Sequence, residues 1–159
     1  MRRDLFFLKG SQYSGSFREV RGYDDEFLLT KENVKEVTTG PGVYIIVAED
    51  KTKFIYPLGN SSVMYIGKAD NLRRRLREHL KNLQETRINE RNLSTERIVS
   101  PSRYHYMDHF GAYVYIYNCL KETQPAKDLE ATIIFKFYEK FRALPVGNGA
   151  MSFGKLYVK

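Results

Sequence analysis

The sequence predicts an α+β fold, because it contains three β-rich segments and two segments with helical periodicity. The β-rich segments are residues 43–47, 63–66 and 112–117, and the helical ones are residues 71–83 and 126–141. The chain has 159 residues, of which 42% are hydrophobic and 14% aromatic, so it is long enough to bury one core. These observations favour one globular domain over two.

We therefore expect a single domain over residues 1–159 with two additions. Residues 1–40 mix short apolar pieces with polar turns, and we interpret them as an N-terminal extension packed on the domain. Within it, Thr30 can cap a short helix over residues 31–37. Residues 84–103 are polar, charged and weakly periodic, so they form a basic insert that is either a loop or an exposed helix.

The first two strands are predicted to pair through a long connection. The turn signal Gly40-Pro41-Gly42 precedes the unbroken apolar run at residues 43–47, which is typical of a buried strand. The second strand is residues 63–66. The connection, residues 49–62, contains a proline, a glycine and an asparagine. We therefore expect antiparallel pairing without a tight hairpin.

The last strand follows from alternation and the last helix from its end signals. In residues 112–117, small apolar side chains alternate with three tyrosines, and this tyrosine row is expected to pack under a helix or cover an edge. Pro125 begins a helix over residues 126–141. Pro145 and the glycine-rich turn at residues 147–149 end it.

Positive charge is concentrated in one part of the chain. There are 26 basic and 19 acidic residues, a net charge of +7. Residues 1–67 contain nine of each kind, whereas residues 68–103 contain ten basic and five acidic side chains. Such a patch suits a polyanion such as nucleic acid, and the alternative is a solvated basic helix. Four of its cations are candidates to bind the substrate: Lys68, Arg73, Arg74 and Arg77.

The helix over residues 71–83 carries a leucine stripe that predicts its buried face: Leu72, Leu76, Leu80 and Leu83. Arg75 and His79 are four residues apart, so they lie side by side at one edge of this stripe. Arg73 lies at the other edge. Helical geometry alone leaves both arginines as candidates for a functional residue and favours Arg75, because His79 lies at the same edge. The alternative is an arginine whose stem packs on the core while its head reaches water.

Glu130 falls inside the apolar sector of the last helix, which is formed by Leu129, Ile133, Ile134, Phe137 and Phe141. Burial of an ionised carboxylate costs roughly several kcal/mol unless a cation or strong donors compensate it. Glu130 therefore needs a metal ion, an arginine partner or access to solvent at the helix edge. An ion pair with arginine and no catalysis is the alternative to a metal site.

Several chemistries find no support in the sequence. The three histidines and Cys119 show no zinc-ligand spacing, no serine lies in a nucleophile elbow, and there is no glycine-rich phosphate loop. Cys119 has no second cysteine for an internal disulfide, and we find no secretory signal or membrane span. We expect a soluble intracellular protein of the cytoplasm or nucleoid, without a membrane partner.

Two tripeptides, Gly42-Val43-Tyr44 and Tyr65-Ile66-Gly67, lie at the first two predicted strands. They resemble the motifs of the GIY-YIG nuclease superfamily: the first stands for its first tripeptide, and the second matches its second tripeptide letter for letter. The likeness continues through residues 68–72, as in the nuclease domain of the bacterial excision-repair enzyme that cuts beside lesions. Four further positions match the family's arginine, a histidine of restriction and homing members, the metal-binding glutamate and the C-terminal asparagine: Arg75, His79, Glu130 and Asn148.

The resemblance implies a GIY-YIG fold, with a small three-stranded, mainly antiparallel sheet flanked by helices. It also implies a metal-dependent endonuclease that hydrolyses phosphodiester bonds of DNA, with double-stranded DNA as the expected partner. One Mg²⁺ or Mn²⁺ per site would be held by Glu130. The catalytic residues would be Tyr44, Tyr65, Arg75, His79 and Glu130.

The resemblance assigns a role to each residue of this site. Either Tyr44 or His79 would take the proton of the attacking water, while Arg75 would bind a phosphate oxygen. As a base, Tyr44 would need a pKa well below about 10, which nearby cations can provide. Tyr65 would bind the phosphate or the water. Gly42 and Gly67 would leave room for backbone close to the site, and Asn148 would join the substrate-binding residues.

The biological role implied is that of a stand-alone restriction-like or mobile-element nuclease, with a structure-specific repair subunit as an alternative. Tyr44 and Tyr65 are 21 residues apart, a spacing similar to that in the family's restriction enzymes. Recognition is expected from residues 1–40, 49–62 or 84–103, from a partner, or from a homodimer. The alternative from another class is a non-catalytic nucleic-acid-binding module that kept the fold and the basic patch.

Overall fold

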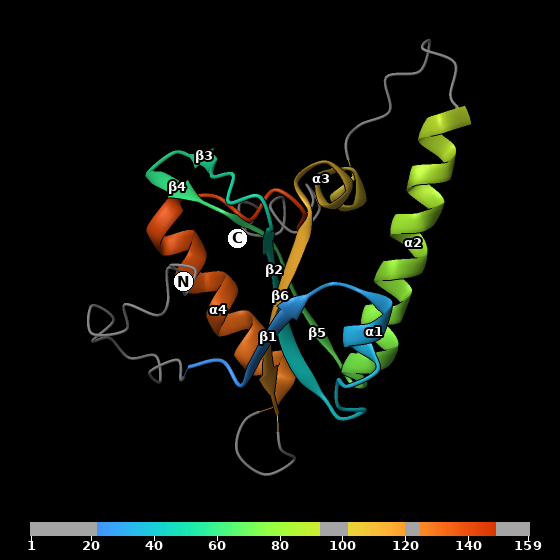
Figure 1. The fold of residues 1–159 in the computed structure, drawn as a ribbon. Coiled ribbons are helices and arrows are strands. Elements are labelled where there is room, and N and C mark those ends of the chain that lie inside the picture. The colour runs from blue at the N-terminus through green and yellow to red at the C-terminus, as the bar shows by residue number, and fades with distance from the viewer. Residues whose placement is uncertain (1–21, 93–101, 120–124, 149–159) are drawn as a thin grey trace.

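The computed structural model describes residues 22–92, 102–119 and 125–148 of the chain (Figure 1). Residues 1–21 of the predicted N-terminal extension and residues 93–101 of the predicted insert lie outside the described residues, as does the last residue of the predicted turn at residues 147–149.

A four-stranded antiparallel sheet forms the centre of the fold, which confirms the predicted α+β class. Its order is β1-β6-β2-β5, with the bounds β1 Asp25–Leu28, β2 Gly42–Ala48, β5 Val63–Ala69 and β6 Ala112–Asn118. The three predicted strands are present, and β2 pairs antiparallel with both β5 and β6. The sheet has one strand more than predicted, because β1 from the N-terminal extension pairs with β6. No apolar pattern marks β1, since its first two residues are acidic.

Helices cover both faces of the sheet (Figure 1). Three of them pack on one face: α1 (Lys31–Val34), α2 (Leu72–Asn92) and α3 (Arg103–Phe110). The other face is covered by α4 (Ala126–Phe141). Every residue of β2 is therefore buried, which accounts for its unbroken apolar sequence. Tyr115 and Tyr117 pack with the apolar residues of α4, so the prediction that this row lies under a helix is confirmed.

The long connection between β2 and β5 contains a second, two-stranded sheet. It is formed by β3 (Phe54–Tyr56) and β4 (Gly59–Ser61). This hairpin is attached to the end of α4, because the backbone N–H of Leu58 donates to the carbonyl of Phe141 at 3.2 Å. The Tyr56 hydroxyl adds a bond to the carbonyl of Val63 at 3.1 Å. The connection is thus an ordered addition packed on the domain.

The three predicted helices are present, two of them with changed bounds: α1 ends at Val34 instead of residue 37 and α2 is longer than predicted, whereas α3 was not predicted. Thr30 caps α1 by accepting from the backbone N–H of Asn33 at 3.1 Å. The helix predicted at residues 71–83 continues to Asn92, so the first part of the predicted insert is helical. The bounds of α4 are those predicted from Pro125 and the apolar periodicity. No helix within the described ranges is long and apolar enough to cross a membrane.

Candidate active site

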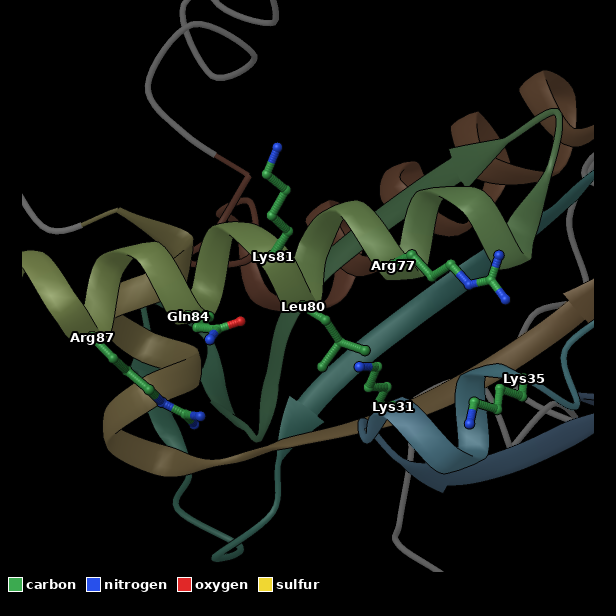
Figure 2. Close-up of a pocket in the computed structure, with 7 residues that line it drawn as sticks. All are labelled: Lys31, Lys35, Arg77, Leu80, Lys81, Gln84 and Arg87. Atoms are coloured by element: carbon green, nitrogen blue, oxygen red, sulfur yellow. The ribbon is translucent and has the colours of Figure 1, made fainter.

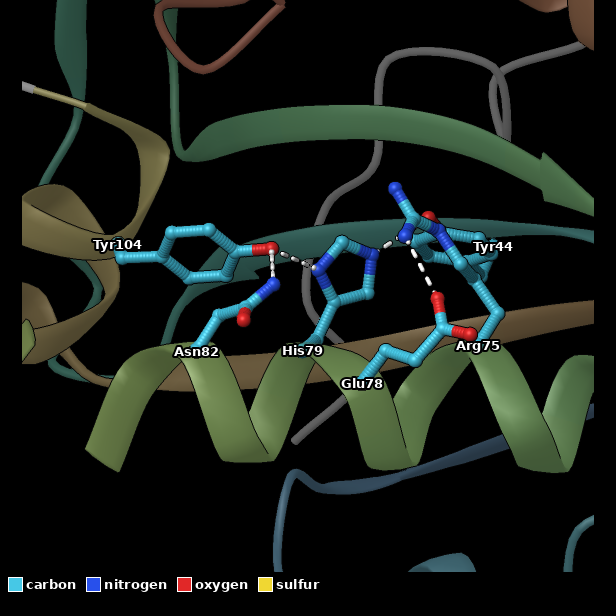
Figure 3. A network of polar contacts seen from close by, with 6 residues as sticks. All are labelled: Tyr44, Arg75, Glu78, His79, Asn82 and Tyr104. Atoms are coloured by element: carbon cyan, nitrogen blue, oxygen red, sulfur yellow. Dashed lines mark hydrogen bonds and ion pairs between the residues drawn. The ribbon is translucent and has the colours of Figure 1, made fainter. Parts of the chain in front are cut away.

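A buried hydrogen bond joins the central strand to α2. The hydroxyl oxygen of Tyr44, on β2, lies 2.6 Å from Nε2 of His79, on α2 (Figure 3). Neither residue is exposed to solvent. His79 occupies the edge of the leucine stripe that the helical spacing predicted, and this edge faces β2 because Leu72 and Leu76 are fully buried beside it. The pair is therefore held by the packing of α2 on the sheet.

The second nitrogen of His79 is held by α3. Its Nδ1 lies 3.0 Å from the hydroxyl of Tyr104, and the side-chain amide of Asn82 donates to the same hydroxyl at 2.9 Å (Figure 3). Two tautomers satisfy this chain. If Nδ1 carries the proton, it donates to Tyr104 and Nε2 accepts from Tyr44; if Nε2 carries it, Tyr104 donates to Nδ1 and Nε2 donates to Tyr44.

Burial keeps both members of the pair neutral. Desolvation, together with the positive charges of Arg75 and Arg103, lowers the pKa of His79 to about 3. Desolvation also raises the pKa of Tyr44 well above its usual value. Tyr65 raises this pKa further, whereas Arg75 lowers it. The sequence-based expectation that nearby cations lower the pKa of Tyr44 is therefore not met in this structure, because burial outweighs their charge. A neutral phenol faces a neutral imidazole.

Tyr65 completes an aromatic cluster around this pair. Its ring centroid lies 5.9 Å from that of Tyr44 and 5.7 Å from that of His79. Gly67 lies opposite Tyr44 in the β2–β5 register, and a Cβ atom there would be 2.5 Å from the Tyr44 hydroxyl. The space at Gly67 is thus filled by the Tyr44 ring. Similarly, a Cβ atom at Gly42 would be 2.5 Å from Cδ1 of Leu72, so that glycine lets α2 begin close to β2.

Two arginines border the cluster. Arg75, on α2, forms an ion pair with Glu78 at 2.9 Å, and its side chain is 33% exposed. Arg103, on α3, places its guanidinium carbon 4.3 Å from the centroid of the Tyr65 ring, a cation–π contact. An exposed ion pair is worth little, so Arg75 can exchange Glu78 for an anion at small cost. Arg75 was predicted at this place, whereas Arg103 was not.

Glu130 reaches the site region from α4. Lys68, the residue after Gly67, lies near its carboxylate, and the charge and backbone of Lys68 both lower the pKa of Glu130. Burial nevertheless raises its pKa, because Lys68 compensates only part of the desolvation. The neighbouring cation is thus a lysine and not the arginine that was considered, and Glu130 is half-buried, so it keeps part of its access to solvent. The helix of Glu130, α4, covers the face of the sheet opposite the Tyr44–His79 pair, and Lys68 belongs to β5, the strand that carries Tyr65.

The donor set at Glu130 fits a magnesium-type ion. Within the described residues, no group of three or more His, Cys, Asp and Glu side chains could hold a metal. Mg²⁺ is commonly bound by one or two carboxylates together with water and substrate phosphates. The single, incompletely compensated carboxylate of Glu130 matches this chemistry, whereas an all-protein zinc or calcium cage would not form from it.

Asn148 binds backbone at the edge of β5. Its Oδ1 accepts from the N–H of Ile66 at 3.0 Å, and its Nδ2 donates to the carbonyl of the same residue at 2.9 Å. The backbone N–H of Gly147 donates to the carbonyl of Met64 at 2.6 Å. These contacts satisfy the open edge of β5 and hold the segment that contains Tyr65 and Gly67. Substrate binding by Asn148 stays a prediction.

The remaining predicted substrate-binding residues are distributed differently. Nε of Arg73 donates to the carbonyl of Val37 at 2.7 Å, which ties α2 to the N-terminal extension. Lys68, Arg74 and Arg77 are exposed. The structure thus brings Tyr44, Tyr65, Arg75 and His79 together, with Glu130 at the adjoining strand.

Sequence reasoning did not single out Asn82, Arg103 or Tyr104. Asn82 lies one turn from His79 and Glu78 on α2, so helical spacing was the available signal for it. Arg103 and Tyr104 begin α3, which follows residues 93–101. Only the docking of α3 on α2 brings them to His79 and Tyr65.

Comparison with known proteins gives one match. The model of the GIY-YIG catalytic domain family matches residues 40–141, which run from the turn before β2 to the last residue of α4. The matched range contains all five predicted catalytic residues, whereas Asn148 lies beyond it. No curated protein and no solved structure gives a significant match to the chain.

Proposed function

The chain belongs to the GIY-YIG catalytic domain family of nucleases, and from this premise we propose that it is a metal-dependent endonuclease that hydrolyses DNA phosphodiester bonds. The observation that carries the proposal is the Tyr44–His79 hydrogen bond, bordered by Arg75 and Arg103, with Glu130 beside Lys68 of the neighbouring strand β5. Hydrolysis needs a proton acceptor for water, positive charge for the phosphate oxygens and a site for a cation.

In the proposed reaction, Tyr44 and His79 remove the proton of the attacking water together. Tyr44 accepts this proton while its own hydroxyl proton passes to Nε2 of His79, so the phenol stays neutral throughout. This step requires the tautomer of His79 that carries its proton on Nδ1. In that tautomer the Nδ1–H donates a hydrogen bond to the Tyr104 hydroxyl. The resulting imidazolium donates to both tyrosine oxygens. The assignment makes His79 the final acceptor and Tyr44 the group that touches the water, which must enter beside the Tyr44 side chain that is buried in this structure.

Phosphate binding prepares His79 for this role. The charges of Arg75 and Arg103 contribute to the low pKa of His79. When a phosphate oxygen binds these guanidinium groups, its negative charge offsets theirs, so the pKa of His79 rises as substrate arrives. Tyr65, which stacks against Arg103, directs that arginine toward the phosphate. The proton acceptor is thus strengthened only in the complex with DNA.

Glu130 would hold one Mg²⁺ or Mn²⁺ ion, which supplies positive charge to the leaving oxygen when it is bound. Lys68 lies beside this carboxylate and limits the repulsion between Glu130 and the phosphate. Lys68 belongs to β5, so the surroundings of Glu130 depend on the strand that carries Tyr65.

A plasmid-relaxation assay tests the proposal. Supercoiled DNA incubated with the protein and Mg²⁺ is expected to become nicked or linear, and EDTA should stop the reaction. A purely binding module would shift the mobility of the plasmid without breaking a strand. Absence of strand breakage with either Mg²⁺ or Mn²⁺, on duplex and single-stranded DNA, would overturn the proposed activity.

We further propose that the nuclease is sequence-specific, as a restriction-like or mobile-element enzyme. The supporting observation is the β3–β4 hairpin inserted between the two tyrosines, on which Ile55 is 88% and Leu58 is 62% exposed. Exposed side chains on a fixed hairpin are available to contact DNA bases. Sequencing the cut ends from a random-sequence substrate decides this point: a consensus is expected, and scattered ends would favour a structure-specific repair enzyme.

A further inference from the structure

We propose that a basic groove between α1 and α2 binds the phosphate backbone of duplex DNA away from the bond that is cut, an inference that rests on the proposed function. The groove has a volume of about 650 Å³. Figure 2 shows that its walls come from both helices, with the polar part of the lining supplied mainly by five cations: Lys31, Lys35, Arg77, Lys81 and Arg87.

The charge of the groove is unbalanced. None of its lining residues is acidic. Within the described part of the chain, no carboxylate forms an ion pair with Lys31, Lys35, Arg77 or Lys81, whereas Arg87 pairs with Asp108 at 2.6 Å. Several like charges around one groove repel one another, and a polyanion relieves this repulsion by replacing the counterions.

The N-terminal extension builds half of this groove. Thr30 caps α1, and the carbonyl of Val37 accepts from Arg73, so the extension is attached to α2 at this place. Leu80 lies at the base of the groove between the two helices (Figure 2). The contact between the extension and α2 thereby holds Lys31 and Lys35 beside the basic side chains of α2.

The groove and the Tyr44–His79 pair lie on opposite flanks of α2. At about 100° per residue, Arg77, Lys81 and Gln84 project from the helix on the side away from Arg75, His79 and Asn82. A phosphate in the groove is therefore not the one beside His79. An α-helix with its side chains is about 10–12 Å wide, similar to the roughly 12 Å of the major groove of B-DNA. Contacts on both flanks of α2 thus suit the two backbones that border one major groove.

The test uses the double variant Lys31→Gln/Lys35→Gln, because neither lysine belongs to the cutting site. The matched control is Lys127→Gln/Lys140→Gln, which removes the same charge from exposed positions of α4. Binding of a fluorescent 30-base-pair duplex is measured by anisotropy in EDTA over a range of salt concentrations. Each lost phosphate contact reduces the slope of log affinity against log salt by about 0.9. The magnitude of this slope should therefore fall by about 2 in the groove variant and stay unchanged in the control.

Cleavage of the plasmid by the same variants separates this inference from the proposed function. At saturating DNA, the groove variant is expected to cut at the wild-type rate. An unchanged salt slope in a variant that still cuts would overturn DNA binding by the groove and leave the proposed nuclease activity intact. If the wild type never cuts, the nuclease proposal fails while the anisotropy result still decides DNA binding by the groove. Binding of labelled polyglutamate that is lost in the groove variant, with DNA affinity unchanged, would assign the groove to an acidic protein and overturn the inference.

Discussion

The Tyr44 hydroxyl, on a strand, and Nε2 of His79, on a helix, lie 2.6 Å apart inside the core, although the two residues are 35 positions apart in sequence. Tyr44→Phe keeps the ring and removes the group proposed to touch the water. We expect single-turnover plasmid nicking to fall by about 10²–10⁴-fold, the range for loss of acid–base catalysis. His79 loses a partner, which costs about 1–3 kcal/mol of stability. A folded variant that nicks within a few-fold of wild type would exclude this role for the Tyr44 hydroxyl.

Glu130→Ala removes the proposed metal ligand. Because burial of this carboxylate is incompletely compensated by Lys68, its loss should not destabilise the fold. We expect an unchanged thermal unfolding temperature, no detectable plasmid cutting, and loss of Mn²⁺ binding in titration calorimetry. Glu130→Asp, with the charge retained on a shorter side chain, serves as the comparison. Cutting at the wild-type rate by folded Glu130→Ala would sink the assignment.

Tyr104→Phe tests whether α3 positions His79. The variant leaves Nδ1 without its hydroxyl partner, and we expect the cleavage rate at saturating DNA to fall roughly ten- to a hundredfold, the range for loss of a group that orients a metal-binding histidine. The KM for DNA should not change, and the ¹⁵N NMR shifts of the His79 ring should report a changed tautomer balance.

The matched control is Tyr106→Phe on the same helix. Its ring contacts Phe54, at 6.0 Å between centroids, and takes no part in the His79 network. If Tyr104→Phe and Tyr106→Phe lower the rate equally, or if the ring shifts of His79 stay constant in Tyr104→Phe, Tyr104 has no positioning role beyond packing.

The low pKa of His79 predicts that acid destabilises the fold. In the unfolded chain the pKa is near its ordinary value of about 6.5, whereas in the folded protein it is about 3. Between these values the unfolded state binds the extra proton, so the free energy of unfolding falls as pH falls through 6.5. The free energy of unfolding, measured with urea, should be roughly 1 kcal/mol lower at pH 5.5 than at pH 7.5. The difference should vanish in His79→Gln; its persistence there would assign it to other groups.

Asn148→Ala removes two hydrogen bonds from the edge of β5. At about 0.5–1.5 kcal/mol each, the loss should lower the free energy of unfolding by roughly 1–3 kcal/mol. The amide of Ile66 should exchange with deuterium much faster, while the amide of Ile45 on the central strand serves as an internal control. Unchanged protection of the Ile66 amide would show that the strand edge is held by other contacts.

Much of the fold could be predicted because its signals are local. The run at residues 43–47 is apolar since both faces of β2 are covered, and the leucine stripe of α2 and the periodicity of α4 follow from helical geometry. β1 could not be predicted from its sequence. It is a strand only because β6 offers an open edge, and pairing with that edge outweighs the weak strand preference of Asp25 and Glu26.

The same distinction applies to the candidate site. By itself, the sequence determined the two tyrosine tripeptides, the shared edge of Arg75 and His79, and the position of Glu130 in an apolar sector that requires a partner. Only the tertiary structure decided what these residues contact: Tyr104 and Arg103 arrive on α3, and Lys68 is the partner of Glu130. The protonation states of Tyr44 and His79 were likewise decided by burial, because desolvation depends on the whole packed environment and not on neighbours in the chain.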